Sequence, residues 1–539
     1  MQRPLGAQIS HMLKDRGVEV IFGIPGVHNQ ELYRGIEEAG LRHVLARHEQ
    51  GAGFMADGYA RATGKPGVAY VITGPGLCNI MTPMGQAYSD SVPMLVISSC
   101  LDETAATRGQ LHQMKDQEGA ARAVCDWSET ARTAEAAYAL IDRALAEMRT
   151  DLSKPKHISV PIAQLEGKAD KGWQTRAFLG PRPTPPEPEW PAYVADRLKN
   201  AHRPVFIFGG GAKQVGFPDM GEALPKTLMR VLERTVAASF TTYAGRGIVP
   251  DDAPLHFGAT LARPASADVF ARADLVIAVG TQLSEVDLWR AHPGHDCPTI
   301  RVDIDPEVLS ATSNQQIPVR ADAATFMALL SEELSEGGTS EWTPTEVADF
   351  RARVRAEIDA ERPGILPVAD ALKEALPPDT MIYSDMTQFA YAAKEVYPMD
   401  RPGHWHHPYG FGTLGYALPA AIGGKIGVGD KPVIAIAGDY GFQYTLQELM
   451  VAVELELTLP IIIWDNGKLG EIEDSMVRAQ IAPNAVIQKN PDFIKLAEAY
   501  GADTAAPETL DAFKAAVRTA LGAKGPTLIY VRADIASSP

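Results

Sequence analysis

Cysteine is scarce in this chain of 539 residues. The four that occur form neither a CxxC pair nor, with histidine, a cluster at zinc-ligand spacing, so a disulfide framework and a structural zinc site are not expected. They are typical of reduced core residues. No run of Lys and Arg occurs, and the net charge is −17, which argues against nucleic acid or an anionic membrane as a partner. The cysteines are Cys78, Cys100, Cys125 and Cys297.

Long apolar runs are also missing. No stretch approaches the roughly 20 residues of a membrane-spanning helix. Residues 1–10 lack the basic and then apolar pattern of a secretory signal. The apolar content of 45% and the charged content of 22% are ordinary for a globular protein. We therefore expect a soluble, cytoplasmic protein with roughly three domains of 150 to 200 residues each.

Three blocks of alternating strand-like and helical pattern follow one another. This alternation predicts an α/β protein of three domains, each with a doubly wound parallel sheet. A proline-dense linker at residues 180–190 and a polar stretch at residues 335–344 separate the blocks, so we assign domains to residues 1–180, 190–340 and 346–539. The expected strands are residues 18–22, 67–72, 94–98, 157–160, 205–208, 275–279, 299–304, 381–383, 433–437, 461–464 and 527–531.

The most informative stretch is residues 433–470, VIAIAGDYGFQYTLQELMVAVELELTLPIIIWDNGKLG. Its pattern predicts a strand at residues 433–437, a helix at residues 445–457 and a second strand at residues 461–464. Two strands joined by one helix form a right-handed parallel crossover, so both end at the same sheet edge. Ligands bind at that edge in open α/β sheets.

Oxygen-bearing side chains follow both of these strands. Asp439 and Asn466 could therefore meet as ligands of a Mg²⁺ ion that bridges a diphosphate. The alternative is a structural turn with an aspartate helix cap. The motif resembles the diphosphate-and-metal motif of thiamine diphosphate (ThDP) enzymes, although Tyr440 replaces a usual glycine and Asp465 a usual asparagine. The resemblance implies metal ligation by Asp439, Asn466 and the backbone carbonyl of Lys468, and cofactor contacts by Gly438, Asp439, Tyr440, Gly441, Asn466, Lys468, Leu469 and Gly470.

Glu49 begins a helix rich in small residues within the segment HVLARHEQGAGFMADGYARATGKPGV, residues 43–68. This segment also resembles the ThDP family. The resemblance implies that Glu49 hydrogen-bonds N1′ of the aminopyrimidine and favours the imino tautomer, whose 4′ nitrogen removes the C2 proton of the thiazolium. The alternative is an ordinary acidic residue at a helix start, where the helix dipole favours a carboxylate.

Three turns complete the predicted cofactor site. The resemblance places Gly76 and Asn79 of ITGPGLCN (residues 72–79) beside the pyrimidine ring; an ordinary strand-to-helix turn is the alternative. In YGFGTLGYALPAAIGG (residues 409–424), the formal GxGxxG does not follow a buried strand and so does not indicate a dinucleotide site. The resemblance implies that Leu414 of this segment separates the two cofactor rings, with plain core packing as the alternative. The further cofactor contacts implied are the Gly412 backbone, the Met386 amide, Thr387 and Gln388.

The resemblance places the substrate contacts in three segments. His28 and Gln113 could assist proton transfers after decarboxylation, although a loop histidine is more often a solvated polar residue. Val27 and His112 are their neighbours. Beyond the metal motif, LGEIEDSM carries Leu469, Glu471, Ile472, Glu473 and Asp474.

These carboxylates would favour a basic 2-oxo acid if they line the pocket, whereas a solvated helix start is the alternative. The segment PGVHNQELYRG, together with these carboxylates, resembles the guanidino-2-oxo-acid decarboxylases more than true acetolactate synthases.

The order of the motifs resembles the pyrimidine-binding, central and diphosphate-binding domains of the ThDP-dependent decarboxylase and acetolactate synthase superfamily. The resemblance implies a ThDP- and Mg²⁺-dependent enzyme that acts on a 2-oxo acid. After loss of CO₂, the carbanion or enamine is protonated by a decarboxylase or attacks a second carbonyl in a carboligase. It also implies a homodimer or homotetramer with active sites at the subunit interface.

Two other classes stay open. The glycine clusters, including residues 208–214, could indicate an NAD- or FAD-dependent oxidoreductase. Some relatives carry FAD beside ThDP. The loop GTQLSEVD (residues 280–287) lacks the Arg-Phe-Asp-Asp motif of FAD-bearing acetolactate synthases, which argues against FAD binding. A non-catalytic homologue is the third class. The joint presence of Glu49, Asp439 and Asn466 argues against that class.

Overall fold

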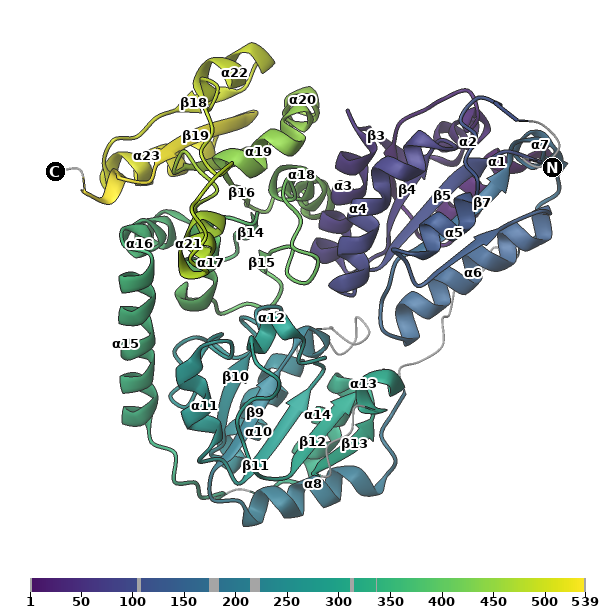
Figure 1. Cartoon of the computed structure of the whole chain (residues 1–539). Helices are drawn as coiled ribbons and strands as arrows, with labels where there is room; N and C mark the ends of the chain where they lie inside the picture. Colours follow the sequence, from purple (N-terminus) through teal and green to yellow (C-terminus); the bar gives the residue numbers. More distant parts are fainter. Residues whose placement is uncertain are drawn as a thin grey trace. The chain divides into compact units, whose positions relative to one another are not determined.

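The chain forms two compact units in the computed structural model (Figure 1), which describes residues 2–103, 108–173, 184–213, 223–310, 315–335 and 337–537. Residues 180–183 of the first predicted linker, Gln214 of the central glycine cluster and Glu336 of the second linker lie outside the described residues. One unit comprises Met1–Pro181, Ala375–Thr387 and His406–Ile535, and the other Arg182–Glu374, Gln388–Trp405 and Ala536–Pro539. The first holds two six-stranded sheets and the second a five-stranded sheet.

The N-terminal six-stranded sheet is parallel and has the order β3-β2-β4-β5-β7-β6. Successive strand residues point to opposite faces, because the side-chain period of a strand is two. Its strands are β2 (Val20–Gly23), β3 (Arg42–Leu45), β4 (Gly67–Val71), β5 (Met94–Cys100), β6 (Trp127–Thr130) and β7 (Lys156–Pro161), and β1 (Arg3–Pro4) and β8 (Lys168–Ala169) form a separate antiparallel pair.

Helices cover both faces of this sheet. Side chains of α1, α2 and α6 share one apolar core with Ile21, Tyr70 and Ile97, whereas those of α3 and α4 share another with the alternating residues Phe22 and Val71. The helices are α1 (Leu5–Asp15), α2 (Gln30–Ala39), α3 (Glu49–Thr63), α4 (Pro75–Ser89), α5 (Gln117–Arg122), α6 (Ala134–Thr150) and α7 (Ile162–Glu166).

The C-terminal six-stranded sheet has the order β15-β14-β16-β17-β19-β18. Counted from β2 and from β14, both sheets have the order second, first, third, fourth, sixth, fifth strand, so the two halves of this unit share one topology. Its strands are β14 (Met381–Ser384), β15 (Trp405–His406), β16 (Val433–Gly438), β17 (Leu459–Asp465), β18 (Asp503–Ala505) and β19 (Pro526–Arg532), and the helices are α18 (Ala417–Val428), α19 (Asp439–Thr445), η2 (Leu446–Glu448), α20 (Leu449–Glu454), α21 (Gly470–Arg478), α22 (Phe493–Tyr500), α23 (Leu510–Ala520) and η3 (Ile535–Ser537). Helix α17 (Gln388–Val396) follows β14 in the chain but belongs to the other unit.

Helices α3 and α18 occupy equivalent places in the two halves and pack against each other, side by side in Figure 1. A Cβ atom at Gly423 would lie 1.9 Å from the carbonyl oxygen of Met55, so the two backbones touch directly. The Tyr383 hydroxyl donates a hydrogen bond to the Gly58 carbonyl (2.8 Å). Only glycine allows backbones this close, which accounts for the small residues of the predicted helix.

The five-stranded sheet of the other unit is parallel and has the order β10-β9-β11-β12-β13. Its strands are β9 (Pro204–Phe208), β10 (Ala238–Thr241), β11 (Leu275–Val279), β12 (Thr299–Asp303) and β13 (Gln316–Arg320), and the helices are α8 (Glu189–Asn200), η1 (Gly210–Lys213), α10 (Ala223–Thr235), α11 (Pro264–Phe270), α12 (Glu285–Leu288), α13 (Pro306–Ser310), α14 (Ala323–Glu333), α15 (Pro344–Glu361) and α16 (Ile365–Ala375).

The predicted fold class, with three α/β domains built on parallel sheets, is confirmed. The helix expected at residues 445–457 differs from prediction, because helical structure already begins at Asp439 and is interrupted by a 3₁₀ turn at Leu446–Glu448. Among the described helices, none combines the length and the hydropathy that a membrane crossing requires.

Candidate functional site

The predicted cofactor residues gather at the switch points of two sheets. In each six-stranded sheet the chain runs outward in opposite directions from the first and third strands, and the crevice above their carboxyl ends is the usual ligand site. In the N-terminal sheet these strands are β2 and β4, followed by His28 and by the Gly74–Asn79 turn. In the C-terminal sheet they are β14 and β16, followed by Met386 and Asp439.

Asp439 begins α19 directly after β16. Gly438 pairs with Trp464 in β17, so Asp439 and Asp465 leave the sheet at the same level. The Asp439 Oδ2 atom accepts hydrogen bonds from Asn490 (2.7 Å) and Gln488 (3.2 Å). Burial and the neighbouring Asp465 carboxylate raise the pKa of Asp439. Two carboxylates are thus held together at this edge.

The turn after β17 carries the other predicted metal ligands. The Asn466 Oδ1 atom accepts the backbone N–H of Lys468 (3.2 Å), and Gly467 has a φ of +68°. The Lys468 ammonium pairs with Glu473, and the Leu469 N–H donates to the Val486 carbonyl (2.8 Å). The turn is therefore fixed on both sides of Lys468.

These residues fit a hard divalent cation. Asp439 and Asp465 repel each other, and Asn490 donates to both carboxylates (2.7 and 3.0 Å), so a positive charge would be stabilised here. Within the described residues, no group of three or more His, Cys, Asp or Glu side chains could hold a metal. A site with few protein ligands, completed by phosphate oxygens, suits Mg²⁺ better than Zn²⁺.

Asp385 links two loops of this half and was missed by the sequence analysis. Its buried carboxylate accepts the backbone N–H of Met386 (2.8 Å) and of Gly415 (2.9 Å), and burial raises its pKa to about 7. A Cβ atom at Gly441 would lie 2.9 Å from the Asp385 Oδ2, so the loop after β16 closes on the same carboxylate. Tyr440, at the usual glycine position, packs edge-on against Tyr444.

The segment with Gly412 and Leu414 is held by α4 of the N-terminal half. Asp90 accepts the backbone N–H of Gly410 (2.8 Å), and Gln86 accepts the Thr413 hydroxyl (3.0 Å). Leu414 is half-buried and Gly412 has a φ of +66°. In the diphosphate loop, Thr387 lies 3.2 Å from a Cβ placed at Gly438, and Gln388 is the first residue of α17.

Glu49 is the first residue of α3 and is buried. Its carboxylate accepts a hydrogen bond from the Asn79 amide (2.9 Å), and a Cβ atom at Gly76 would lie 3.4 Å from its Oε1. Sequence reasoning placed all three residues at the pyrimidine ring, and the structure brings them together. The His48 ring accepts the Gln50 N–H and caps the helix.

Two further side chains, the buried Glu448 and the partly buried Gln117, support this arrangement and were also missed. Glu448 of the C-terminal half accepts the backbone N–H of Arg47 (3.1 Å) beside the start of α3, and burial raises its pKa to about 7. Gln117 accepts the Gly74 N–H (3.1 Å) in the turn before Asn79. Both act on backbone groups far away in sequence, so no local pattern could have found them.

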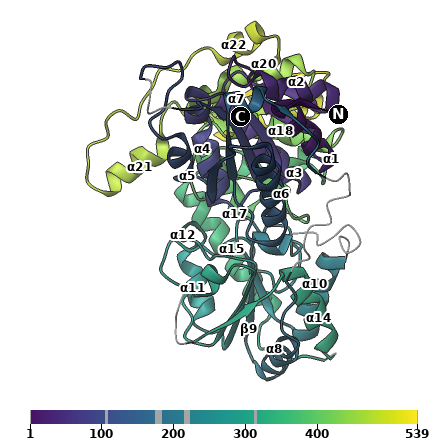
Figure 2. The same ribbon diagram turned by 90° about the vertical axis from the view of Figure 1, so that its right-hand side faces the viewer.

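The predicted substrate residues divide into two groups. The Nδ1 atoms of His28 and His112 lie 3.3 Å apart, whereas the side-chain Oε1 atom of Gln113 accepts the backbone N–H of Gly109 (2.8 Å) within its own loop. Helix α21 stands away from the rest of its unit in Figure 2, with Ile472 49% exposed. Glu471 pairs with Arg478 at the surface (3.5 Å).

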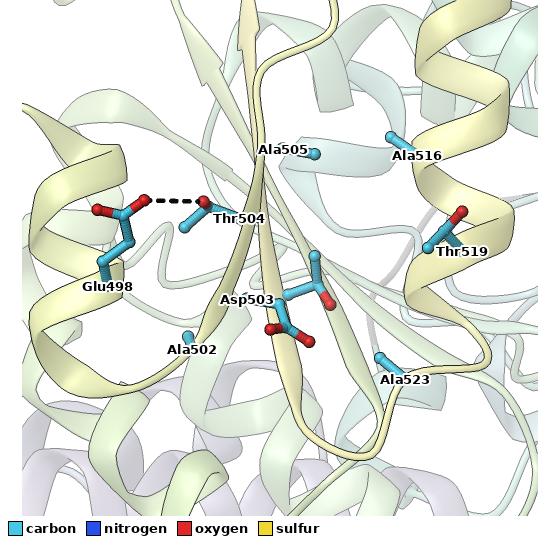
Figure 3. A pocket seen from close by; sticks show the side chains of 9 residues that line it. Glu498, Ala502, Asp503, Thr504, Ala505, Ala516, Thr519 and Ala523 are labelled. Carbon is cyan, nitrogen blue, oxygen red and sulfur yellow. Dashed lines mark hydrogen bonds between the residues drawn. The ribbon is translucent and has the colours of Figure 1, made fainter.

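A hollow of about 590 Å³ lies elsewhere, between α22, β18, α23 and β19 (Figure 3). Thr527, one of its lining residues, is the second residue of β19, so the hollow lies at the sheet edge opposite to Asp439 and Asn466. At the rim of the hollow, the Glu498 carboxylate accepts a hydrogen bond from the Thr504 hydroxyl. It contains none of the predicted site residues.

Comparison with known proteins accounts for this arrangement. Models of the thiamine pyrophosphate enzymes match the chain three times: the N-terminal TPP binding domain at residues 3–120, the central domain at 192–330 and the C-terminal TPP binding domain at 385–531. The probable 2-ketoarginine decarboxylase AruI of Pseudomonas aeruginosa is 41% identical, over 98% of this chain and 93% of its own.

Acetolactate synthases are more distant relatives. The isozyme 3 large subunit of Escherichia coli is 29% identical over 93% of this chain and 89% of its own, and the enzyme of Mycobacterium avium is 30% identical over 92% and 82%. The resemblance drawn from the sequence motifs is thereby confirmed. The chain belongs to the thiamine pyrophosphate enzymes, in the superfamily of decarboxylases and acetolactate synthase-like proteins.

Proposed function

We propose that this protein is a ThDP- and Mg²⁺-dependent decarboxylase of a basic 2-oxo acid. The observation that carries the proposal is a pair of half-sites: Glu49 accepts a hydrogen bond from Asn79 at one switch point, and Asp439 stands level with Asp465, the neighbour of Asn466, at the other. The likeness to a probable 2-ketoarginine decarboxylase over nearly the full length of both chains supports the guanidino substrate. Acetolactate synthase-like carboligation is the second candidate, supported by the relatives at 29% and 30% identity.

The residues that would hold Mg²⁺ are Asp439 and Asn466 through their side chains and Lys468 through its backbone carbonyl. Bound ThDP would supply the electron sink that lets CO₂ leave the substrate. Glu49 would hold a proton at its carboxylate against the aminopyrimidine, and the Asn79 hydrogen bond orients that carboxylate. The further cofactor contacts we propose are Gly76, Met386, Thr387, Gln388, Gly412, Leu414, Gly438, Tyr440, Gly441, Leu469 and Gly470.

Helix α21 is proposed to recognise the substrate cation. Glu471 and Glu473 already hold cations of this chain, Arg478 and Lys468, which supports the view that a guanidinium can be accepted there. A charge-assisted hydrogen bond of this kind contributes about 1.5–3 kcal/mol. His28 and Gln113 are proposed to assist proton transfer after CO₂ has left.

A homodimer or homotetramer with active sites at the subunit interface is part of the proposal. Large apolar side chains on and after α21 are exposed, and such patches mark interaction surfaces. They are Ile472, Val477, Ile481 and Ile487, exposed by 49%, 59%, 53% and 77%.

Domain limits at residues 1–180, 190–340 and 346–539 and a cytoplasmic location complete the proposal. All four cysteines are free thiols, which supports a reducing compartment. Three of them are buried, whereas Cys78 is exposed, so the expectation that all four lie in the core was wrong for Cys78. The switch point of the central sheet offers little support for FAD binding. There, a Cβ atom at Gly209 would lie 2.3 Å from the Gly280 carbonyl oxygen, so the two loops are already packed together.

The deciding experiment is titration calorimetry with ThDP and Mg²⁺, followed by CO₂ release from a panel of 2-oxo acids. The panel should include 5-guanidino-2-oxopentanoate and pyruvate. We expect Mg²⁺-dependent ThDP binding and preference for the guanidino acid, with the aldehyde as product. Acetolactate from pyruvate would support the second candidate instead, and absence of ThDP binding would overturn both. An absorbance spectrum of the purified protein tests for flavin.

A further inference from the structure

Charged and polar side chains of α3 and α4 meet beside the turn at residues 409–416, which precedes α18. Arg61 of α3 forms ion pairs with Asp57, one helical turn earlier (2.6 Å), and with Asp90 at the end of α4 (2.8 Å). The side-chain amide of Gln86 in α4 donates a further hydrogen bond to Asp90 (2.8 Å). We refer to these four residues as the Arg61 network.

The position of these charges is unfavourable for the two helices alone. The side chains of Asp57, Asp90 and Arg61 are exposed by only 0%, 5% and 10%. Burying a charge costs free energy unless it is paired and hydrogen-bonded, and here two carboxylates share one guanidinium. Asp90 also stands at the C-terminal end of α4, where the helix dipole disfavours a carboxylate. Further hydrogen-bond donors are therefore needed to stabilise the Arg61 network.

Those donors come from the turn that precedes α18. Asp90 accepts the backbone N–H of Tyr409 (3.2 Å) and of Gly410 (2.8 Å). Asp57 accepts a hydrogen bond from the hydroxyl of Tyr416 (2.8 Å). Hydrogen bonds to charged acceptors are stronger than those between neutral groups. The two carboxylates thus hold the turn at its start and at its end.

The middle of the turn is held as well. The Gln86 side chain is fully buried; its oxygen accepts the Thr413 hydroxyl (3.0 Å), while its nitrogen donates to Asp90. Leu414 directly follows Thr413, and both Thr413 and Tyr416 are buried. The backbone of Leu414 therefore runs between two residues that the Arg61 network fixes. The place of Leu414 relative to α3 and α4 follows from these contacts.

We propose that the Arg61 network positions the two rings of ThDP, because it holds Leu414 where this side chain separates them. Its members are positioning residues, since none of them needs to touch the cofactor. The diphosphate loop and the metal site are held by other side chains, among them Asp385 and Asn490. The Arg61 network therefore raises the affinity for a diphosphate that carries both rings, and leaves the affinity for a bare diphosphate unchanged. The inference rests on the proposed ThDP site.

The first test needs no cofactor. Amide hydrogen exchange of the full chain is followed by peptide mass spectrometry in the wild type and in Asp90→Asn. Asn keeps the size of the side chain, but one oxygen acceptor and the charge opposite Arg61 are lost, whichever way its amide is turned. We expect the peptide with residues 407–416 to exchange at least about tenfold faster, because its N–H groups lose charged acceptors. Unchanged exchange of this peptide overturns the proposal.

Asp142→Asn is the matched control. Asp142 forms a two-pronged ion pair with the buried Arg16 in the same half of the chain (2.6 and 3.0 Å), away from the turn. Residues 407–416 should exchange in this variant as in the wild type. If Asp90→Asn does not fold, Thr413→Val takes its place. It removes a single hydroxyl of the turn and should give a smaller acceleration in the same peptide.

The second test separates the rings from the diphosphate. The affinities for ThDP and for inorganic pyrophosphate, each with Mg²⁺, are measured by calorimetry. In Asp90→Asn we expect ThDP binding to weaken by about tenfold or more, and pyrophosphate binding to stay as in the wild type. Asp142→Asn should change neither affinity. Equal weakening for both ligands, or an unchanged affinity for ThDP, overturns the positioning role.

The failure of this inference differs from that of the proposed function. If the wild-type protein binds no ThDP, the proposed function fails, and the role toward the two rings fails with it. Faster exchange of residues 407–416 in Asp90→Asn then still shows that the Arg61 network holds the turn. If the wild type and Asp90→Asn bind ThDP equally well, the proposed function stands and only the positioning role is overturned.

Discussion

Gly58 of α3 lies against the backbone of Ala420 in α18, so close that a Cβ atom at position 58 would be 1.9 Å from the Ala420 carbonyl oxygen. In the opposite direction, a Cβ atom at Gly423 of α18 would also lie 1.9 Å from a carbonyl oxygen of α3, that of Met55. Each helix follows the second strand of its half and precedes the third. The pair of helices thus joins two halves of equal topology through direct backbone contacts.

Gly58→Ala tests this contact. The added methyl group must push two backbones apart, and overpacking of a core usually costs about 1–3 kcal/mol. We expect a lower urea midpoint of unfolding by circular dichroism. Gly525→Ala is the matched control, because a Cβ atom there meets no other atom within 4 Å. Equal midpoints for the two variants would contradict the direct contact.

Glu49→Gln tests the proposed acid. The amide keeps the size of the side chain but cannot exchange a proton with the aminopyrimidine, so we expect turnover to fall by about 10²–10⁴-fold at saturating ThDP. The far-ultraviolet circular dichroism spectrum should be unchanged. The exposed Glu508→Gln should retain the wild-type rate. Turnover by Glu49→Gln near the wild-type rate would remove Glu49 from the mechanism.

Glu448→Gln tests a pH dependence of stability. Burial raises the pKa of Glu448 to about 7, so the folded protein holds this proton more tightly than the unfolded chain. The stabilisation is complete below the unfolded pKa and is lost as the pH rises through about 7. We expect the urea midpoint of the cofactor-free wild-type protein to fall between pH 5 and about pH 8, and to fall less in Glu448→Gln. Asp385, whose pKa is also raised to about 7, contributes a fall that both proteins share.

Asp439→Asn should separate metal binding from folding. The neutral amide removes the cost of a buried charge and the repulsion with Asp465, which both raise the pKa of Asp439, so the cofactor-free protein should be at least as stable as the wild type at pH 8. Mg²⁺-dependent ThDP binding should weaken at least about tenfold in calorimetry, as outer-shell changes alone cost about 10–100-fold. Exposed Asp503→Asn is the control. Undiminished ThDP affinity in Asp439→Asn would argue that the ion binds elsewhere.

The double variant Glu471→Gln/Glu473→Gln tests substrate recognition. Loss of one or two charge-assisted hydrogen bonds should lower kcat/KM for 5-guanidino-2-oxopentanoate by about tenfold or more. The activity toward pyruvate should change little, since pyruvate carries no cation. Glu498→Gln, at the distant hollow of Figure 3, is the control. A parallel loss for both substrates would point to a role in cofactor binding or folding.

Much of the sheet architecture could be predicted because the core strands are apolar, β-branched runs that end in Gly, Pro or polar turns. β11 has the predicted bounds, and β16 and β17 extend their predictions by only one to three residues. The helix after β16 was placed too late, because the Gly441 and aromatic residues of α19 have low helix propensity and tertiary packing overrides it.

The residues that support the site could not be predicted from the sequence, for a different reason. Asp385, Glu448 and Gln117 accept hydrogen bonds from backbone N–H groups, and two of these partners lie 43 and 401 residues away in sequence. A backbone amide leaves no signature in the sequence, so only three-dimensional structure identifies such partners. His28 and His112 are 84 residues apart, and their pairing was equally invisible.

The backbone contact of α3 with α18 also restricts motion. Glu49 is the first residue of α3, and the turn with Leu414 leads directly into α18. Since no flexible side chain lies between the two helices at Gly58 and Gly423, neither can shift without displacing the other. Glu49 and Leu414 are therefore mounted on a common rigid frame, and any movement that admits a substrate has to come from other segments.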